Sequence, residues 1–385
     1  MTNSSLRYAL KIAAAGSTFA LILCGCGAKD GLKELAEGKA AYEIKDYRKA
    51  EHLFEKGLGY APENVEILLC LARVKLDLGE IAESCKFINA AQQYGGGDID
   101  VRQLSGQIAW HAKDYNRAAE IFRGIVTDMS LDAKTRARAL AEIGIVEMSL
   151  NRPHLARVAF LKAIRLDRYN AAACYHLGLV YRDAPFGYND AALEQFEKFV
   201  RLDVEASPRV QKVQRSVIPA LKELIAGTLT SRPGSSRRDS SACAEALTKA
   251  DEAWKKNQFK TAKLRYEEAL KADSLSARAA LGLARSVLKT DATRNGDKKA
   301  LEYYRTACTL SPMSSNTLLE TGKHAMKLGY YQQAAEAYSR ALAANCVSRP
   351  AIEGLIAAFG KIGYRKAEIK AYREYLDMLP KAQKK

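Results

Sequence analysis

The chain has 385 residues, of which 48% are apolar and 27% charged, so it is long and apolar enough to bury an extensive core. A formal net charge of +16 would suit a nucleic-acid binder. No nucleic-acid motif occurs, however, and the features of the N-terminus described next also argue against one, so we expect no nucleic-acid partner.

Residues 1–25 have the character of an export signal, with a weakly positive start and a short, mostly apolar stretch. The stretch is too brief to span a bilayer, which needs about 20 apolar residues. Its ending, Leu23-Cys24-Gly25-Cys26, resembles the lipobox of bacterial lipoproteins, in which the cysteine thiol is acylated before cleavage. The resemblance implies that Cys26 is the lipidated first residue of the mature chain. An ordinary secretory signal or an uncleaved anchor is the alternative.

Lipidation would attach the chain to a membrane, because each buried methylene contributes about 0.8 kcal/mol. In diderm bacteria an aspartate directly after the acylated cysteine retains lipoproteins in the inner membrane. Here Gly27 follows Cys26. The resemblance therefore favours a bacterial envelope protein that is lipid-anchored in the outer membrane and faces the periplasm.

A repeat of about 34 residues occupies most of the remaining chain. One aromatic or large apolar position recurs as Phe54, Ile88, Phe122, Phe160, Phe196, Tyr266, Tyr304, Tyr338 and Tyr372. A small residue stands four positions earlier in all units but the last, which has Glu368. Apolar spacing of three to four residues predicts helices. Since such a unit cannot bury its own apolar face, the units must stack on one another as a solenoid.

Each unit reads as two helices joined by a short turn, such as Lys45-Asp46-Tyr47 or Lys113-Asp114-Tyr115. Small residues on the first helix, such as Gly38 and Gly144, let the two helices approach closely while the aromatic fills the gap. These positions together resemble the tetratricopeptide repeat family over residues 31–206 and 243–382, in nine units. The resemblance implies an all-α, right-handed superhelical solenoid with a concave groove for peptides or partner proteins. An ordinary helical bundle is the alternative.

We expect two repeat blocks. The first, residues 26–206, holds about five units, and the second, residues 243–385, holds about four. Between them, residues 207–242 combine an amphipathic helix, kinked at Pro219, with a flexible linker. The second block carries the positive charge, with 26 basic and 15 acidic side chains. The relative orientation of the blocks is left open.

The first helix of each unit lines the groove in most members of the family. The resemblance therefore implies that partners contact first-helix side chains. The candidates are Arg73, Gln103, Gln107, Tyr175, Arg182, Trp254, Lys255, Arg285, Lys323 and Lys327. Tryptophan is a frequent hot-spot residue at interfaces, although Trp254 could equally pack between helices.

No constellation in the sequence predicts catalysis, a metal or a cofactor. No pair among the five histidines has metal-ligand spacing on one helix, and no Gly-rich phosphate loop follows a strand. We therefore predict a protein that is not an enzyme. Cys70 and Cys85 fall on the two helices of one unit and could pair in an oxidising compartment. The alternative is that each packs as a small apolar side chain.

Two functions remain. The first is a membrane-anchored scaffold or adaptor lipoprotein that mediates protein–protein interactions in envelope assembly or secretion. The alternative is a binder or regulator of an anionic envelope polymer, such as peptidoglycan or an exported polysaccharide, through the basic block. Added salt separates the two, because binding to a polyanion weakens as charges are screened.

Overall fold

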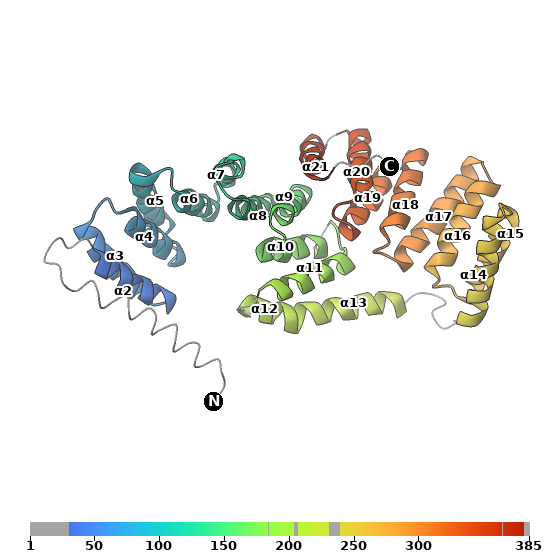
Figure 1. Ribbon diagram of the computed structural model, residues 1–385, viewed down its shortest axis with the longest axis horizontal. Helices are drawn as coiled ribbons and strands as arrows, with labels where there is room; N and C mark the ends of the chain where they lie inside the picture. The colour runs from blue at the N-terminus through green and yellow to red at the C-terminus, as the bar shows by residue number, and fades with distance from the viewer. Residues whose placement is uncertain (1–30, 184, 204–206, 231–238, 364, 381–385) are drawn as a thin grey trace, which may run out of the picture. The chain divides into compact units, whose positions relative to one another are not determined.

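The computed structural model describes residues 31–183, 185–203, 207–230, 239–363 and 365–380, so Cys26 and the predicted signal peptide lie outside the described residues. The described chain consists of helices joined by short turns (Figure 1). No described helix is both long and apolar enough to cross a bilayer. The chain divides into two compact units, Met1–Lys113 and Asp114–Lys385.

The first unit holds two complete helix pairs and the first helix of a third. The helices are α2 (Leu32–Glu43), α3 (Tyr47–Tyr60), α4 (Val65–Asp77), α5 (Ile81–Gly95) and α6 (Ile99–His111). Successive helices contact each other from α2 to α6. The division between the units thus falls inside the third predicted repeat.

The second unit begins with α7 (Tyr115–Thr127), which packs on α8. The helices up to the middle of the unit are α8 (Ala133–Ser149), α9 (Pro153–Leu166), α10 (Ala171–Arg182), α11 (Asn189–Leu202), α12 (Pro208–Lys212) and α13 (Ile218–Thr230). Four further pairs follow: α14 (Ser240–Lys255) with α15 (Phe259–Ala272), α16 (Ala277–Thr290) with α17 (Arg294–Leu310), α18 (Ser315–Leu328) with α19 (Tyr331–Ala344), and α20 (Arg349–Ile362) with α21 (Lys366–Met378). The predicted all-α class and helix–turn–helix units are confirmed.

The recurring aromatic position forms the core of the repeats. All nine residues at this position are at most 4% exposed, and the small residue four positions earlier is fully buried in the first eight units. A glycine on the first helix leaves room for the ring. A Cβ atom at Gly38 would lie 2.4 Å from Phe54 Cε1, and one at Gly144 equally close to Phe160 Cε1. The close approach of the two helices therefore depends on the missing side chain.

The turns within repeats use one backbone device. Lys45, Lys113, Asn151 and Asn257 have φ between 55° and 63°, and Gly329 has 81° at the equivalent point. This left-handed conformation ends the first helix and reverses the chain. Residues other than glycine adopt this conformation at a free-energy cost, and the lysines and asparagines of these turns adopt it nevertheless.

The expected amphipathic helix after the fifth pair is present with an irregularity. A π-helical turn, Val213–Val217, joins α12 to α13 directly before Pro219. Proline has no backbone N–H, so the ordinary hydrogen-bond ladder is interrupted at this point. Val213 and Leu221 are buried, and α13 packs on α11. Leu224, also on α13, is half exposed.

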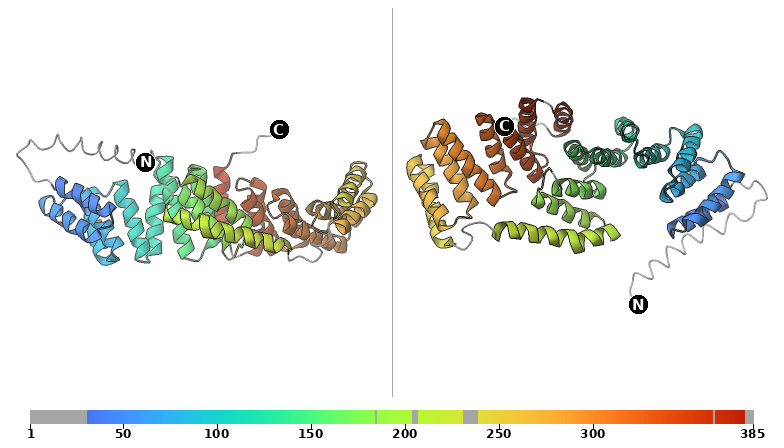
Figure 2. Two further views of the ribbon diagram at one scale, coloured as in Figure 1. Left: turned by 90° about the horizontal axis from the view of Figure 1, so that it is seen from below. Right: turned by 180° about the vertical axis from the view of Figure 1, so that it is seen from behind.

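The last helix of the second unit returns to the middle of the chain. Helix α21 contacts α9 as well as α20 (Figures 1 and 2). Buried side chains of residues 140–221 and 301–379 belong to one continuous apolar cluster. Lys162 on α9 pairs with Glu374 on α21 at 2.6 Å. The predicted block boundaries at 206 and 242 stay predictions, but this cluster includes side chains from both sides of them.

Candidate functional site

Ion pairs connect successive first helices in the second unit. Arg278 on α16 pairs with Asp251 on α14. Arg285 on α16 donates to both carboxylate oxygens of Glu320 on α18, at 2.9 Å and 2.5 Å. We call the polar surface of these three helices the first-helix face; it comprises Asp251, Lys255, Arg278, Arg285, Glu320, Lys323 and Lys327.

Tyrosines of the second helices hold the two carboxylates in place. The Tyr266 hydroxyl donates to Asp251 at 2.5 Å, and the Tyr304 hydroxyl donates to Glu320 at 3.1 Å. Burial, reinforced by the neighbouring carboxylate, raises the pKa of both tyrosines. Burial alone would raise the pKa of Glu320, but the hydrogen bonds and charge of Arg285 outweigh it and lower that pKa. Glu320 is thus an ionised acceptor with fixed partners.

Lys327 also has a partner within the chain. Its Nζ lies 2.9 Å from a carboxylate oxygen of Asp297, the buried residue in the first turn of α17. His324 approaches the same residue, with Nε2 3.0 Å from the Asp297 backbone oxygen. Lys327 therefore helps to neutralise a buried carboxylate.

Lys255 and Lys323 differ from these cations. Both side chains are exposed, at the end of α14 and in the middle of α18. Within the described ranges, neither ammonium group has a carboxylate at ion-pair distance. Of the four predicted cations on the first-helix face, these two keep their charge available to a partner.

Three further candidates contact other side chains of this chain: Trp254, Tyr175 and Arg182. Trp254 is half-buried and meets Phe259 edge to face, with 5.0 Å between ring centroids. Tyr175 packs on Phe199 at 5.1 Å. Arg182 pairs with the next residue, Asp183, at 2.7 Å. Packing within the chain therefore accounts for Trp254 and Tyr175, and no binding partner is needed to explain them.

The three candidates in the first unit lie on two helices. Arg73 is exposed on α4, and Gln103 and Gln107 are half-buried on α6. The first helices are linked here as well, because the Tyr42 hydroxyl on α2 donates to Asp77 at the end of α4. Burial and this hydrogen bond both raise the pKa of Tyr42.

The two cysteines of the predicted pair lie on neighbouring helices of the first unit. Cys70 and Cys85 are both free and half-buried, so the structure shows no disulfide between them. Burial raises the pKa of the Cys70 thiol, which makes it a poor nucleophile. Across the described residues, no group of three or more His, Cys, Asp or Glu side chains is arranged to hold a metal ion.

Sequence reasoning missed one carboxylate and one arginine of this face. Glu320 and the basic residue Arg278 were not among the candidates, although both stand on first helices. A charge-pair pattern of about one repeat length, such as Arg285 with Glu320 35 residues later, is the signal that could have found them.

Helix pairs in which a second-helix aromatic packs on a small first-helix residue define an α-helical repeat protein. The tetratricopeptide repeat family model matches residues 41–108 and, again, residues 247–315. These two segments are tetratricopeptide repeats, and repeats of this kind support a scaffold for protein–protein interactions. No curated protein matches it in sequence.

Several solved structures resemble the chain weakly. One is described as a functional characterisation of Pseudomonas aeruginosa pilF, with 14% identity, a TM-score of 0.36, and 78% of this chain and 98% of that one covered. A crystal structure of MamA protein has 20% identity, a TM-score of 0.35 and coverages of 49% and 96%. At these values the likenesses carry no argument about function.

Proposed function

We propose that this protein is a membrane-anchored scaffold of the bacterial envelope whose first-helix face binds an acidic segment of a partner protein. The observation that carries the proposal is the difference between paired and unpaired cations on that face. Arg278, Arg285 and Lys327 are neutralised by carboxylates of the chain, whereas Lys255 and Lys323 are exposed without one.

The paired residues prepare the surface for binding. Salt bridges between successive first helices, such as Arg285 with Glu320, fix the spacing of those helices before a partner arrives. A preorganised surface loses less conformational entropy on association. The excess of basic residues in 243–385 adds a field that attracts an acidic partner and increases the association rate.

Site-specific crosslinking in cells tests the protein-binding surface. A photoreactive amino acid is placed at Lys255 or Lys323, and, as the control, at Lys271, which is exposed on the second helix α15. We expect one discrete protein adduct from both first-helix positions and none from Lys271. Adducts of equal yield from all three positions would contradict the proposal.

A charge-reversal variant tests whether the charge of the first-helix face contributes to partner binding. Lys323→Glu should reduce the yield of that adduct from position 255, because an acidic segment would then face a like charge. Lys271→Glu makes the same change of charge on α15 and should leave the yield unchanged. An identical yield in the two variants would show that charge on the first-helix face does not select the partner.

The lipid anchor at Cys26 is tested separately. Metabolic labelling with an alkynyl fatty acid should mark the wild-type chain and the Cys24→Ala variant but not Cys26→Ala. Membrane fractionation of the labelled cells then reports whether the chain is in the outer membrane. Labelling that survives Cys26→Ala and disappears in Cys24→Ala would move the anchor to the other cysteine.

An anionic envelope polymer is the second candidate, favoured by the charge of residues 243–385. Co-sedimentation of the purified chain with peptidoglycan sacculi distinguishes it from a protein ligand. Polymer binding should be strong at low ionic strength and disappear at about 1 M salt, where the screening length is about 3 Å. No sedimentation at low salt would remove peptidoglycan from consideration.

A further inference from the structure

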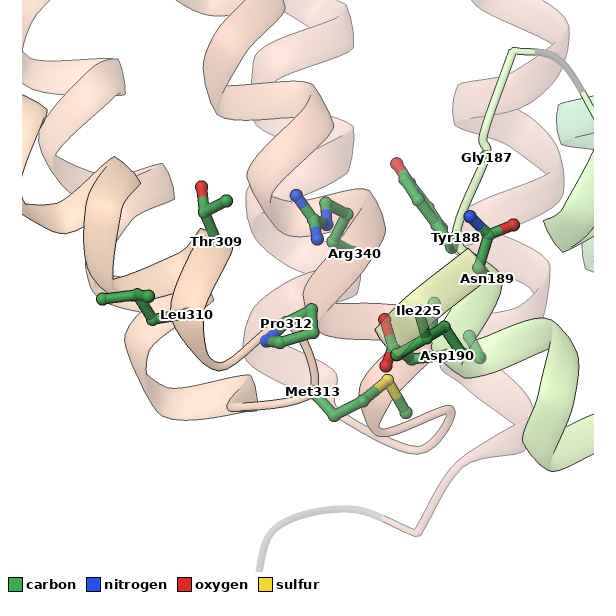
Figure 3. A pocket seen from close by; sticks show the side chains of 12 residues that line it. Gly187, Tyr188, Asn189, Asp190, Ile225, Thr309, Leu310, Pro312, Met313 and Arg340 are labelled. Carbon is green, nitrogen blue, oxygen red and sulfur yellow. The ribbon is translucent and has the colours of Figure 1, made fainter. Parts of the chain in front are cut away.

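A crevice lies inside the second unit, where the start of α11 and the body of α13 meet the ends of α17 and α19. Its main chamber has a volume of about 280 Å³ and is lined by residues from all four helices (Figure 3). A second chamber of about 180 Å³ continues between α17, α18 and α19. Thr309 and Arg340 line both chambers, so the two are adjacent, and together we call them the crevice.

Arg340 is the central feature of this crevice. It projects from α19 between Thr309 on one side and Tyr188 on the other (Figure 3). Its guanidinium carbon lies 5.6 Å from the centroid of the Tyr188 ring, a cation–π distance. Over the described residues, this half-buried guanidinium forms no ion pair.

The guanidinium of Arg340 has no carboxylate partner among the described residues. By contrast, the half-buried Arg285 on α16 has a bidentate carboxylate partner. Two carboxylates line the crevice, Asp190 in the main chamber and Glu336 in the second one, and neither is at ion-pair distance from the guanidinium. A partly desolvated cation with free N–H groups favours an incoming anion over water.

The lining of the main chamber includes apolar and neutral polar side chains besides the charged Arg340. Leu310, Pro312, Met313 and Ile225 give it an apolar side (Figure 3). Thr309 and Asn189 add neutral hydrogen-bonding groups to the lining. A ligand that fits both sides combines a carboxylate with an adjacent apolar side chain, and a peptide segment supplies that combination at a fixed spacing.

We propose that this crevice is a second peptide-binding site, which takes an acidic side chain of a partner protein on Arg340 and an adjacent apolar side chain on Leu310, Met313 and Ile225. The site is separate from the first-helix face and does not depend on it. Charge complementarity selects the acidic peptide, and the apolar wall selects its neighbour. Asp190 opposes the same carboxylate and so limits the affinity.

Fluorescence anisotropy with two labelled octapeptides tests this site on the purified chain. One peptide alternates leucine and aspartate, and the other alternates leucine and asparagine. We expect the aspartate peptide to bind at least about tenfold more tightly, because the guanidinium gains a charge-assisted bond. Equal affinities for the two peptides would overturn the proposal.

Three variants assign the binding to the crevice. Arg340→Gln should weaken the aspartate peptide by about tenfold or more, whereas Lys299→Gln, an exposed charge on α17 outside the crevice, should have no effect. Asp190→Asn should strengthen binding, and a gain of affinity cannot result from misfolding.

The two proposed surfaces are distinguished in the same assay. If Lys255→Glu with Lys323→Glu abolishes binding while Arg340→Gln does not, the peptide occupies the first-helix face and the crevice proposal is wrong. If Arg340→Gln abolishes binding and the lysine variants do not, the crevice is the site whatever happens to the first-helix face.

Discussion

Arg157 and Tyr372 are 215 residues apart in sequence, yet Nε of Arg157 donates a hydrogen bond to the Tyr372 hydroxyl at 2.9 Å. The Nη1 group of Arg157 donates to Ser339 Oγ at 2.5 Å, and the ring of Phe186 lies 4.6 Å from the guanidinium carbon. Arg157 is fully buried, and none of the described carboxylates pairs with it. Neutral oxygens and aromatic rings therefore stabilise this cation where α9, α19 and α21 meet.

Removal of the Tyr372 hydroxyl tests this arrangement. Tyr372→Phe leaves a buried cation with fewer acceptors and should lower the free energy of unfolding by about 2 kcal/mol, the usual range for a hydrogen bond to a charged group. Tyr338→Phe is the matched control, because Tyr338 occupies the same position of its repeat and its hydroxyl has no partner among the described residues. Urea unfolding measures both. Equal losses would mean that the Arg157 bonds do not stabilise the fold.

The pH dependence of stability should reflect His154. Burial, with the nearby charges of Arg157 and Arg365, lowers the pKa of His154 to about 3 from the ordinary 6.5. Below pH 6.5 the unfolded chain binds a proton that the folded chain refuses, so stability falls as the pH drops through this window and is constant above it. The slope from this group is up to about 1.4 kcal/mol per pH unit.

Thermal unfolding between pH 7 and about pH 5 checks this expectation. His154→Gln removes the titrating group and should reduce the slope, whereas His52→Gln changes an exposed residue and should not. His176, whose pKa burial lowers to about 4, should keep part of the slope in the His154 variant. A slope that is the same in all three proteins would show that the folded chain protonates these imidazoles without cost.

Replacing the left-handed lysines of the turns by glycine should stabilise the fold. Lys45 and Lys113 have φ of 63° and 62°. Glycine adopts this conformation without strain, so Lys45→Gly and Lys113→Gly should each raise the free energy of unfolding by up to about 1 kcal/mol. Lys49→Gly, at an exposed position inside α3, should lower it by a similar amount. Chemical denaturation of the three variants settles the sign.

A glycine that packs against a core aromatic ring, such as Gly144, should not tolerate replacement even by alanine. A methyl group at Gly144 would lie 2.4 Å from Phe160, so Gly144→Ala should cost about 1–3 kcal/mol through overpacking. Adding Phe160→Leu to Gly144→Ala should return part of that loss, because the ring that meets the methyl group is gone. Strict additivity of the two changes would show that the contact is not the cause.

The packing between adjacent helices could be predicted from the sequence. Aromatic, small and turn residues recur because two adjacent helices pack closely in the same way in each repeat. The ring of Phe160 against Gly144 is one example. The 3.6-residue helical period makes these positions visible without a structure. Family assignment and core positions were therefore within reach.

Contacts between distant repeats could not be predicted in this way. Arg157 follows a core alanine on α9 and looks like a surface residue, because its partners Ser339 and Tyr372 are about 200 positions away. The same holds for Arg340, which becomes part of a crevice only when α19 approaches the loop at Tyr188. Of the ten predicted contact positions, several are occupied by pairs such as Arg285 with Glu320 that no single-repeat pattern reveals.

The return of α21 to α9 changes how this solenoid should fold. In a linear repeat array each repeat contacts only its neighbours, so the ends can fray independently and the stability is nearly a sum over repeats. Here the last helix closes a loop of about 200 residues against the fourth repeat, which increases contact order and slows folding. Damage to residues 366–378 should thus unfold the middle of the unit along with its end, and residues 114–385 should behave as one cooperative domain.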